Sequence, residues 1–487
     1  METVNALSLR ATYRHPRARE YRSQGGAWDV PTLDQLLGSQ DTGSAFGAQV
    51  AALAGDLRAR GVRRGSVVAW QLPNWPEVAA LYRACWQVGA IAAPIHHNAG
   101  AADLQRMLQV LDPAVFLDVD SLRARVKSMS TAPPDTRSTT RTAPFPTVRP
   151  ADLAVALFTA GTSGEPKAVL HTHRGLAHKT TTMVTAHGLT SSDVVLMPAP
   201  LAHISGLLNG LLVPGLAGMR SILMERWDPE EALATIERER VTFMVGPPTF
   251  FIGLMNSSGF TPERVASLRL VSSGGTGVTA DFVAEASERL GAHVKRAYGS
   301  TEAPTIATST GTDPAHRSRD SDGRVVGQAE LRIASDGELL VRGPELFAGY
   351  IDADQTRAAT TRGWFRTGDL ANLNNGWLTI TGRIKDVIIR GGENISAGEV
   401  EEILARHPSV REAVAVGYPD DRLGERVCAF VVASDNFDLQ ACIQHFTNEG
   451  IARFKTPERV VVLGALPVLG AGKVDRSALR DLARAGI

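Results

Sequence analysis

The chain has 487 residues, of which 44% are hydrophobic and 21% are charged. This length exceeds what one hydrophobic core supports, and the composition is far from that of a disordered protein, so we expect a folded chain with more than one domain. The 51 basic and 51 acidic residues cancel to a net charge of +0, without a long run of one sign. Nucleic acid is therefore not an expected partner.

Cysteine spacing and hydropathy indicate in which cellular compartment the protein is expected. Cys85, Cys428 and Cys442 lie far apart without a metal-binding spacing, which predicts free buried thiols in a reducing environment. The arginine-rich segment Met1 to Trp28 lacks the continuous apolar core of a signal peptide. The most apolar stretch, Ile204 to Met219, is interrupted by proline, glycine and polar residues, and favours a buried helix over a membrane span. We expect a cytoplasmic protein without a membrane span.

Strand-like and helix-like segments alternate through the first two thirds of the chain. A helical pattern at Phe46 to Arg60 precedes a strand at Ser66 to Leu72, a helix at Pro76 to Val88 and a strand at Ala90 to Ile95. Further expected strands are Ala114 to Leu117, Val155 to Thr159, Val194 to Met197, Thr242 to Gly246 and Arg269 to Ser272, with helices at Pro229 to Arg240 and Thr279 to Leu290. Such alternation predicts α/β architecture with mostly parallel, helix-covered sheets.

Three regions differ from this pattern. Ser128 to Pro150 holds 14 Ser, Thr or Pro residues among 23 and is expected to be a surface linker. After about Gly323, shorter strands with tight turns predict a small antiparallel or barrel-like subdomain. Beyond Arg383, alternating strands and helices predict a small α+β domain of about 100 residues. We therefore expect a large domain at residues 1–384 and a mobile C-terminal cap at residues 385–487.

A run rich in glycine and hydroxyl groups follows the predicted strand that ends at Phe158. In Thr159 to Lys167 (TAGTSGEPK), the two glycines let the backbone approach a polyanion. Thr162 and Ser163 offer hydroxyl donors, and Lys167 supplies a positive charge. A proline precedes the lysine and no helix-opening Ser or Thr follows it, so the run is not a Walker motif. It predicts a phosphate-binding loop of another type.

Five further motifs follow in order along the chain. They are Tyr298 to Glu302 (YGSTE), Thr367 to Asp369 (TGD), Gly382 to Asp386 (GRIKD), Gly391 to Ile395 (GGENI) and Gly470 to Lys473 (GAGK). Together with the phosphate loop, this set resembles the core motifs of the adenylate-forming superfamily. That superfamily includes acyl-CoA synthetases, aryl-CoA ligases, peptide-synthetase adenylation domains and firefly luciferase. The resemblance extends from about Phe46 to Arg480.

The resemblance implies ATP-dependent activation of a carboxylic acid. The carboxylate is joined to the α-phosphate of ATP, pyrophosphate leaves, and the mixed anhydride then reacts with an acceptor. The catalytic residues implied are Thr162, Lys167, Glu302 and Lys473, with Glu302 as the Mg²⁺ ligand. The nucleotide-binding residues implied are Thr159, Thr162, Ser163, Gly274, Gly275, Thr276, Tyr298, Gly299, Thr301, Asp369 and Arg383. Among them, Asp369 would accept hydrogen bonds from the ribose hydroxyls, with Arg383 beside it.

The same resemblance implies a moving C-terminal domain. Lys473 would bridge the acid and the α-phosphate, and Lys385 lies at the position of the family hinge. Rotation would then present Gly391, Gly392 and Glu393 to CoA.

The residues implied for the acid pocket are His203, Leu207, Pro247, Phe250 and Ser300. A lone histidine on an apolar segment is also often a core residue, and we expect mainly structural roles for His171 and His173. Ala160 and Ala168 depart from the serine and glycine that are usual in the phosphate loop, which predicts weaker ATP binding.

The predicted activity is that of a CoA ligase for a small or aromatic carboxylic acid, using ATP, Mg²⁺ and CoA, as a monomer or homodimer. One alternative keeps the adenylation but changes the acceptor or the acid, to the phosphopantetheine arm of a carrier protein or to an oxyacid such as nitrite. Another alternative is a nucleotide-binding homologue without catalysis. The presence of Glu302, Asp369, Arg383 and Lys473 argues against this last class.

Overall fold

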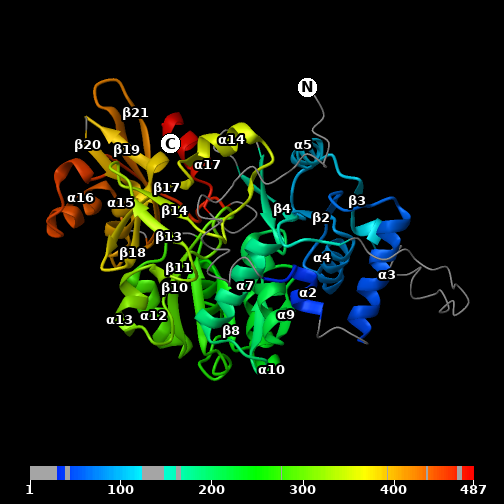
Figure 1. The fold of residues 1–487 in the computed structure, drawn as a ribbon. Helices are drawn as coiled ribbons and strands as arrows, with labels where there is room; N and C mark the ends of the chain where they lie inside the picture. Colours follow the sequence, from blue (N-terminus) through cyan, green and yellow to red (C-terminus); the bar gives the residue numbers. More distant parts are fainter. Residues whose placement is uncertain are drawn as a thin grey trace, which may run out of the picture.

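The computed structural model of the protein contains three β-sheets (Figure 1). The structure describes residues 30–38, 44–122, 147–160, 166–275, 277–391, 393–434, 437–468 and 474–486. Five predicted site residues, Thr162, Ser163, Thr276, Gly392 and Lys473, lie outside these ranges, as does most of the predicted linker.

The first sheet, sheet A, has the strand order β15-β5-β4-β2-β1-β3. Strand β1 runs parallel to β2 and β3, and β2 runs parallel to β4, whereas β4 and β5 form an antiparallel hairpin and β15 pairs antiparallel with β5. Its strands are β1 (Val67–Gln71), β2 (Ile91–Ile95), β3 (Val115–Leu117), β4 (Leu153–Ala160), β5 (Pro166–Thr172) and β15 (Gly349–Tyr350). The predicted parallel pairing is confirmed for β1 to β4.

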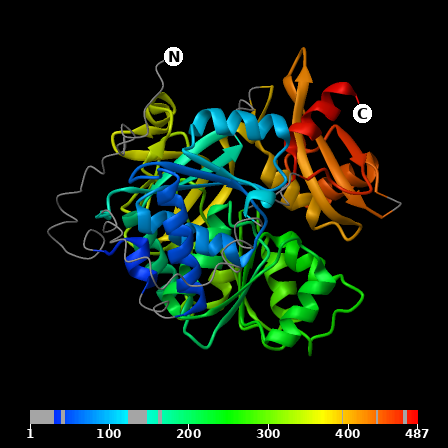
Figure 2. The same ribbon diagram turned by 90° about the vertical axis from the view of Figure 1, so that its right-hand side faces the viewer.

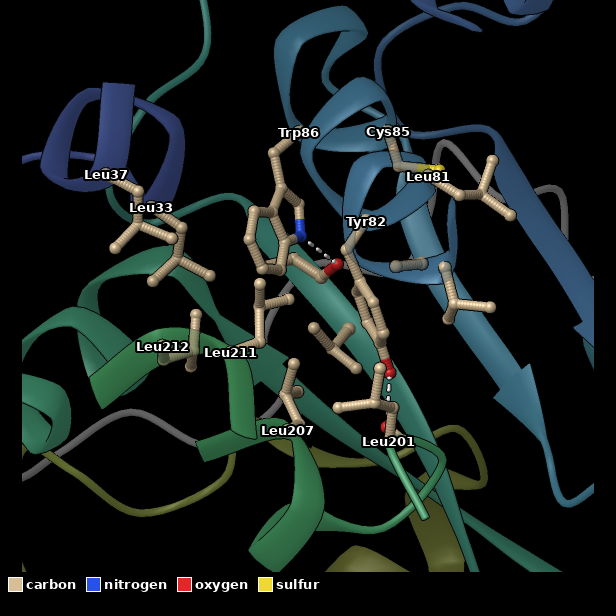
Figure 3. Packing of buried hydrophobic residues seen from close by; sticks show 14 of the residues in the cluster. Leu33, Leu37, Leu81, Tyr82, Cys85, Trp86, Leu201, Leu207, Leu211 and Leu212 are labelled. Carbon is tan, nitrogen blue, oxygen red and sulfur yellow. Dashed lines mark hydrogen bonds between the residues drawn. The ribbon is translucent and has the colours of Figure 1, made fainter. Parts of the chain in front are cut away.

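A buried cluster joins sheet A to the segment that follows β6 (Val194–Met197). Figure 3 shows Tyr82 and Trp86 of α4 (Pro76–Val88) pointing between α2 (Leu33–Gly38) and the leucines of residues 201–212. The Tyr82 hydroxyl donates to Leu201 O at 2.7 Å, and Trp86 Nε1 donates to Ala154 O at 3.1 Å. Large aromatic side chains thus bury their surface while their polar ends stay hydrogen-bonded.

The second sheet, sheet B, begins as a parallel sheet with the order β10-β9-β8-β6-β7. These strands are β6 (Val194–Met197), β7 (Arg220–Leu223), β8 (Phe243–Gly246), β9 (Leu270–Gly274) and β10 (His293–Tyr298). The helices between them are α10 (Pro229–Glu239), α11 (Pro248–Met255) and α12 (Ala280–Leu290).

Beyond β10, sheet B continues through antiparallel pairs in the order β11, β12, β18, β17, β14 and β13, so the antiparallel pairing predicted after about Gly323 is confirmed for β12, β13, β14, β17 and β18. The sheet therefore runs unbroken from the parallel core to the end of the large domain. Its later strands are β11 (Ala307–Thr308), β12 (Gly323–Val325), β13 (Glu330–Ile333), β14 (Glu338–Arg342), β16 (Thr360–Thr361), β17 (Trp364–Asn374) and β18 (Trp377–Arg383).

The apolar segment after β6 is helical and buried, as predicted. It consists of α8 (Ile204–Leu207), a π-helical turn (Leu208–Leu212) and α9 (Val213–Ala217). In the described ranges, no helix combines the length and the apolar composition that crossing a membrane requires. The remaining helices of the large domain are α3 (Ala45–Ala59), α5 (Ala101–Leu111), α7 (His173–His187), α13 (Ala315–Asp320) and α14 (Ala353–Ala359).

The third sheet, sheet C, is formed by the C-terminal residues and lies at one side of the molecule, in orange in Figures 1 and 2. Its strands are β19 (Val387–Arg390), β20 (Glu393–Ser396), β21 (Val410–Asp420), β22 (Gly424–Ala433) and β23 (Arg459–Val462), with helices α15 (Ala397–Ala405), α16 (Leu439–Asn448) and α17 (Arg476–Ala485). A 3-10 turn, η3 (Ile384–Asp386), connects sheet B to sheet C, and another, η4 (Arg453–Lys455), precedes β23. The boundary between residues 384 and 385 stays a prediction.

All three cysteines are free and buried, as predicted. Burial raises the pKa of the Cys442 thiol to about 12 and that of Cys428 to about 11. Such thiols are inert at neutral pH.

Candidate active site

Asp369 of β17 is contacted by side chains from two other strands of sheet B. The Tyr298 hydroxyl, from the end of β10, donates to Asp369 Oδ2 at 2.7 Å, and Arg383 Nε, from the end of β18, donates to Asp369 Oδ1 at 3.0 Å. Asp369 and Arg383 are register partners across the β17–β18 hairpin. Burial, and then the charge of Asp369, raise the pKa of Tyr298 well above its usual value, so this tyrosine stays protonated and donates. The structure therefore brings these three predicted residues together.

The end of β9 allows another backbone to come very close. Gly274 pairs with Ala297 of β10, and a Cβ at Gly274 would lie 2.2 Å from Ala297 O. Gly275 follows with a φ of +84°, a conformation that L-residues with side chains rarely adopt. Glycine is therefore required at both positions, which lie one strand away from Tyr298.

The turn from Tyr298 to Thr305 carries Glu302. Ser300 N donates to Ala303 O at 3.0 Å, and Ile306 N donates to Tyr298 O at 2.8 Å. A Cβ at Gly299 would lie 2.3 Å from Thr305 N, so only glycine fits this tight turn. The motif thus holds Tyr298 and Glu302 on one short, closed loop.

Side chains of β5 and α7, the elements that follow the phosphate loop, hydrogen-bond to the backbone of this turn. His171 Nε2 lies 2.8 Å from Thr301 O, and because a carbonyl only accepts, Nε2 carries the proton. Lys179 of α7 donates to Thr305 O at 2.9 Å and lies 3.5 Å from Glu345 Oε1, with both side chains fully buried. Burial lowers the pKa of His171 to about 4 and also lowers the pKa of Lys179. The backbone around Glu302 is therefore fixed by the elements after Lys167.

The Glu302 side chain is held by Tyr350, a residue that the sequence interpretation missed. The Tyr350 hydroxyl donates to Glu302 Oε1 at 2.7 Å, and Lys167 Nζ lies 5.5 Å from the centre of the Tyr350 ring. Lys167 pairs with Thr159 across the β4–β5 hairpin, so both predicted phosphate-binding residues flank the same end of sheet A. The contacts of Tyr350 with Glu302 and Lys167 cross large sequence separations, and no local pattern signals them.

Four of the five predicted acid-pocket residues, His203, Leu207, Pro247 and Phe250, follow the carboxyl ends of β6 and β8. Strand β7 lies on one side of β6 and β8 on the other, so the chain direction across the sheet reverses between β6 and β8. Ligands of open α/β sheets bind at such switch points, outside the carboxyl ends of the strands. His203 precedes α8, and Pro247 precedes α11.

The side chains at this switch point are mostly uncharged and aromatic. The Phe250 ring stacks on Trp227 with centroids 4.6 Å apart. The His203 ring meets the edge of His96 at 5.3 Å, and burial lowers the pKa of His96 to about 4. Leu207 is fully buried in the cluster of Figure 3.

Ser300 lies apart from this group in the Glu302 loop, where its Oγ accepts from Ala303 N at 3.2 Å.

The connection between sheets B and C is short and charged. Lys385 is exposed in η3, and Asp386 next to it pairs with Arg480 of α17. Gly391 adopts a φ of +60° in the turn between β19 and β20, and Glu393 begins β20. The predicted hinge residue and the described residues of the predicted CoA face therefore follow one another directly along the chain.

A buried carboxylate that accepts from two donors, glycine turns beside it, and a second carboxylate that contacts the same tyrosine as a lysine are the features expected of a nucleotide-binding enzyme. The chain matches the model for the AMP-binding enzyme family over residues 33–351 and the model for the AMP-binding enzyme C-terminal domain over residues 399–473. The chain belongs to this family. The predicted membership of the adenylate-forming superfamily is confirmed.

Relatives with curated names and solved structures agree with this assignment. The chain is 32% identical to the medium-chain fatty-acid–CoA ligase of Escherichia coli strain K12, over 97% of this chain and 94% of the relative. It is 33% identical to the indoleacetate–CoA ligase of Aromatoleum aromaticum, over 88% and 91% of the two chains. The ATP-bound structure of MatB from Rhodopseudomonas palustris matches with a TM-score of 0.82 at 26% identity, over 90% of this chain and 93% of that one.

Proposed function

We propose that the protein joins a small or aromatic carboxylic acid to AMP, with release of pyrophosphate from ATP, and then transfers the acyl group to CoA. The observation that carries the proposal is the Tyr298–Glu302 turn. At one end its Tyr298 contacts Asp369, and at the other end its Glu302 contacts Tyr350 beside Lys167. One closed loop therefore connects a site suited to a sugar with a site suited to phosphates.

The sugar end is the Asp369 carboxylate. A carboxylate can accept about four hydrogen bonds, and two of these positions are taken by Tyr298 and Arg383. Asp369 therefore keeps the capacity to accept from both ribose hydroxyls. Gly274, Gly275 and Thr276 would border the adenine, since glycine lets the backbone approach a flat ring.

The phosphate end must offset the repulsion between an attacking carboxylate and a polyanion. Lys167 and Thr159 flank the loop that holds Thr162 and Ser163, and Thr301 lies next to Glu302. Among the residues that the structure describes, no group of three or more His, Cys, Asp or Glu side chains could hold a metal ion. Mg²⁺, which binds through one or two carboxylates together with phosphate oxygens and water, fits a site with Glu302 as its ligand. When bound, Mg²⁺ would neutralise charge on the phosphates.

The C-terminal domain would act in both steps. Lys473 would bridge the acid and the α-phosphate during adenylation, with residues 385–487 closed over the nucleotide. Rotation about Lys385 would then bring Gly391, Gly392 and Glu393 to the site for the reaction with CoA. An exposed hinge residue in a three-residue turn between two sheets supports this motion, because few backbone torsions need to change.

The acid would bind at the switch point of sheet B. Its proposed lining consists of His203, Leu207, Pro247 and Phe250, with Ser300 contributed by the Glu302 loop. The stacked Phe250 and Trp227 rings favour an aromatic or apolar acid, and the low pKa of His96 keeps a neutral ring beside His203. Pocket-forming side chains of this kind, apolar with a few polar groups, are typical of small-molecule sites.

A panel of carboxylic acids, read by pyrophosphate release with and without CoA, tests the proposal. We expect release to depend on one class of small or aromatic acid, CoA to be consumed in equal amount, and Glu302→Gln to abolish both. Pyrophosphate release without CoA consumption would indicate another acceptor. ATP binding without release for any acid would indicate a non-catalytic homologue.

A further inference from the structure

Strand pairing places Tyr350 beside the residues of the phosphate loop. Tyr350 of β15 is the register partner of Val169 in β5, two residues after Lys167. Side chains of Lys167 and Val169 share one face of the strand, and a diagonal neighbour across an antiparallel pair is within reach of aromatic and long side chains. This geometry explains why Lys167 Nζ lies over the Tyr350 ring.

Among the residues that the structure describes, the Tyr350 hydroxyl is the hydrogen-bond partner of the Glu302 carboxylate. Tyr350 is only 6% exposed, and burial, followed by the charge of Glu302, raises its pKa above the usual value. The hydroxyl therefore stays protonated and donates to Glu302 Oε1. Within the described ranges, Glu302 Oε2 makes no hydrogen bond, whereas Oε1 accepts from Tyr350.

The backbone of Glu302 is fixed independently of Tyr350. Phe347 N donates to Glu302 O at 2.8 Å, and the flanking carbonyls of Thr301 and Thr305 bind His171 and Lys179. The torsions of the Glu302 side chain are not fixed by these backbone contacts, and the hydrogen bond from the Tyr350 hydroxyl is the described contact that restrains them.

Two side chains of opposite charge therefore contact the same aromatic residue without contacting each other. Lys167 and Glu302 both contact Tyr350, yet they form no ion pair in the described part of the chain. A direct pair would neutralise the ammonium group that a phosphate needs and would occupy the carboxylate that a cation needs.

We propose that Tyr350 is a positioning residue that holds Glu302 apart from Lys167, with Oε2 left for a divalent cation. This inference rests on the proposed function, since it concerns the nucleotide–Mg²⁺ site of that reaction. Tyr350 touches neither phosphate nor cation in this role and acts through Glu302.

The first test uses Tyr350→Phe, which keeps the ring and removes the hydroxyl. Calorimetry with a non-hydrolysable ATP analogue gives the dissociation constant with and without Mg²⁺. We expect the gain in affinity due to Mg²⁺ to fall about tenfold, the size of a hydrogen bond to a charged group, while Mg²⁺-free binding stays unchanged. Tyr418→Phe, at a ring under Arg459 in sheet C, is the matched control and should change neither value.

A double-mutant cycle separates positioning from a general structural effect. If Tyr350 acts through Glu302, adding Tyr350→Phe to Glu302→Gln should cause no further loss of the Mg²⁺ gain. Tyr350→Met, which removes ring and hydroxyl, should let Lys167 and Glu302 pair and so also weaken Mg²⁺-free binding. Adding Glu302→Gln to Tyr350→Met should restore that Mg²⁺-free affinity. Melting curves of each variant confirm folding.

Two outcomes overturn the inference. One is an equal loss of affinity with and without Mg²⁺ in Tyr350→Phe, and the other is an additive loss in the double variant with Glu302→Gln. A wild-type protein that binds no ATP analogue at all would instead contradict the proposed function, so the two failures are distinguishable.

Discussion

Asp369 is held by two donors from the protein itself. Its side chain is 8% exposed, whereas that of Arg383 is 53% exposed, so the carboxylate is fixed inside the site by a partner that still reaches solvent. Tyr298 fixes the other oxygen. A ribose would therefore meet an acceptor that is already oriented, at little further cost in side-chain entropy.

Asp369→Asn keeps the size of the side chain and replaces one accepting oxygen with an amide. We expect the KM for ATP to rise roughly tenfold or more, as for loss of a hydrogen bond to a charged group, with a smaller change in kcat. Initial rates of pyrophosphate release at varied ATP concentrations measure both constants. An unchanged KM for ATP would remove Asp369 from the nucleotide site.

His173 is a buried neutral histidine at the start of α7. Its Nδ1 accepts from Leu33 N at 3.3 Å, and burial lowers its pKa to about 4. The unfolded chain takes up a proton near the ordinary value of about 6.5, whereas the folded chain does not until the pH falls much lower. Stability from this residue is therefore lost as the pH falls from about 6.5 towards 4.

The effect of His173 on unfolding should be measurable. Between pH 7 and pH 5 we expect it to lower the free energy of unfolding by about 2 kcal/mol. His173→Asn, which keeps an acceptor in place of Nδ1, should reduce the pH dependence in urea unfolding by that amount, whereas His316→Gln on the exposed surface of α13 should not. An identical pH dependence in wild type and His173→Asn would contradict the assignment.

At the scale of elements, local signals were enough to place many helices and strands. The predicted helix Pro76 to Val88 matches α4 because proline starts a helix readily and Gly89 ends it with a φ of +73°. The contact of Asp369 with Arg383 lies within one hairpin and agrees with the motif order. The two-residue strand β15 has no such signal, since only its pairing with β5 defines it. Tyr350 therefore stayed outside the predicted site, although its partner Glu302 was in it.

The η3 turn is the element on which domain rotation depends. Proline at position 385 would fix φ near about −65° and would push Ile384 away from helical torsions. We expect Lys385→Pro to leave adenylate formation largely intact and to suppress transfer to CoA. Separate assays of pyrophosphate release and acyl-CoA formation measure the two steps.

Lys385→Ala is the control for that experiment, since it removes the charge and leaves the backbone free. It should retain more CoA transfer than Lys385→Pro. Wild-type rates of acyl-CoA formation in Lys385→Pro would argue against a rotation about this residue.

At the scale of the whole molecule, a nucleotide that bridges sheets A and B should stabilise the large domain. A ligand present at 100 times its dissociation constant raises the free energy of unfolding by about 2.7 kcal/mol. We expect a non-hydrolysable ATP analogue with Mg²⁺ to raise the melting temperature, and adenosine at equal concentration to raise it less. Equal shifts for both would mean that the phosphate end contributes no affinity.

The pairing of β15 with β5 also has a consequence for synthesis on the ribosome. Strand β5 emerges early, but the strand that covers its free edge, Gly349–Tyr350, comes much later in the chain. During that interval the nascent polypeptide exposes an unpaired edge, which can associate with other chains. Fragments that stop before Gly349 are therefore expected to aggregate more than fragments that include Tyr350. Gly349 and Tyr350 complete the edge of sheet A, and their synthesis therefore ends the period in which the nascent chain can associate with other chains through that edge.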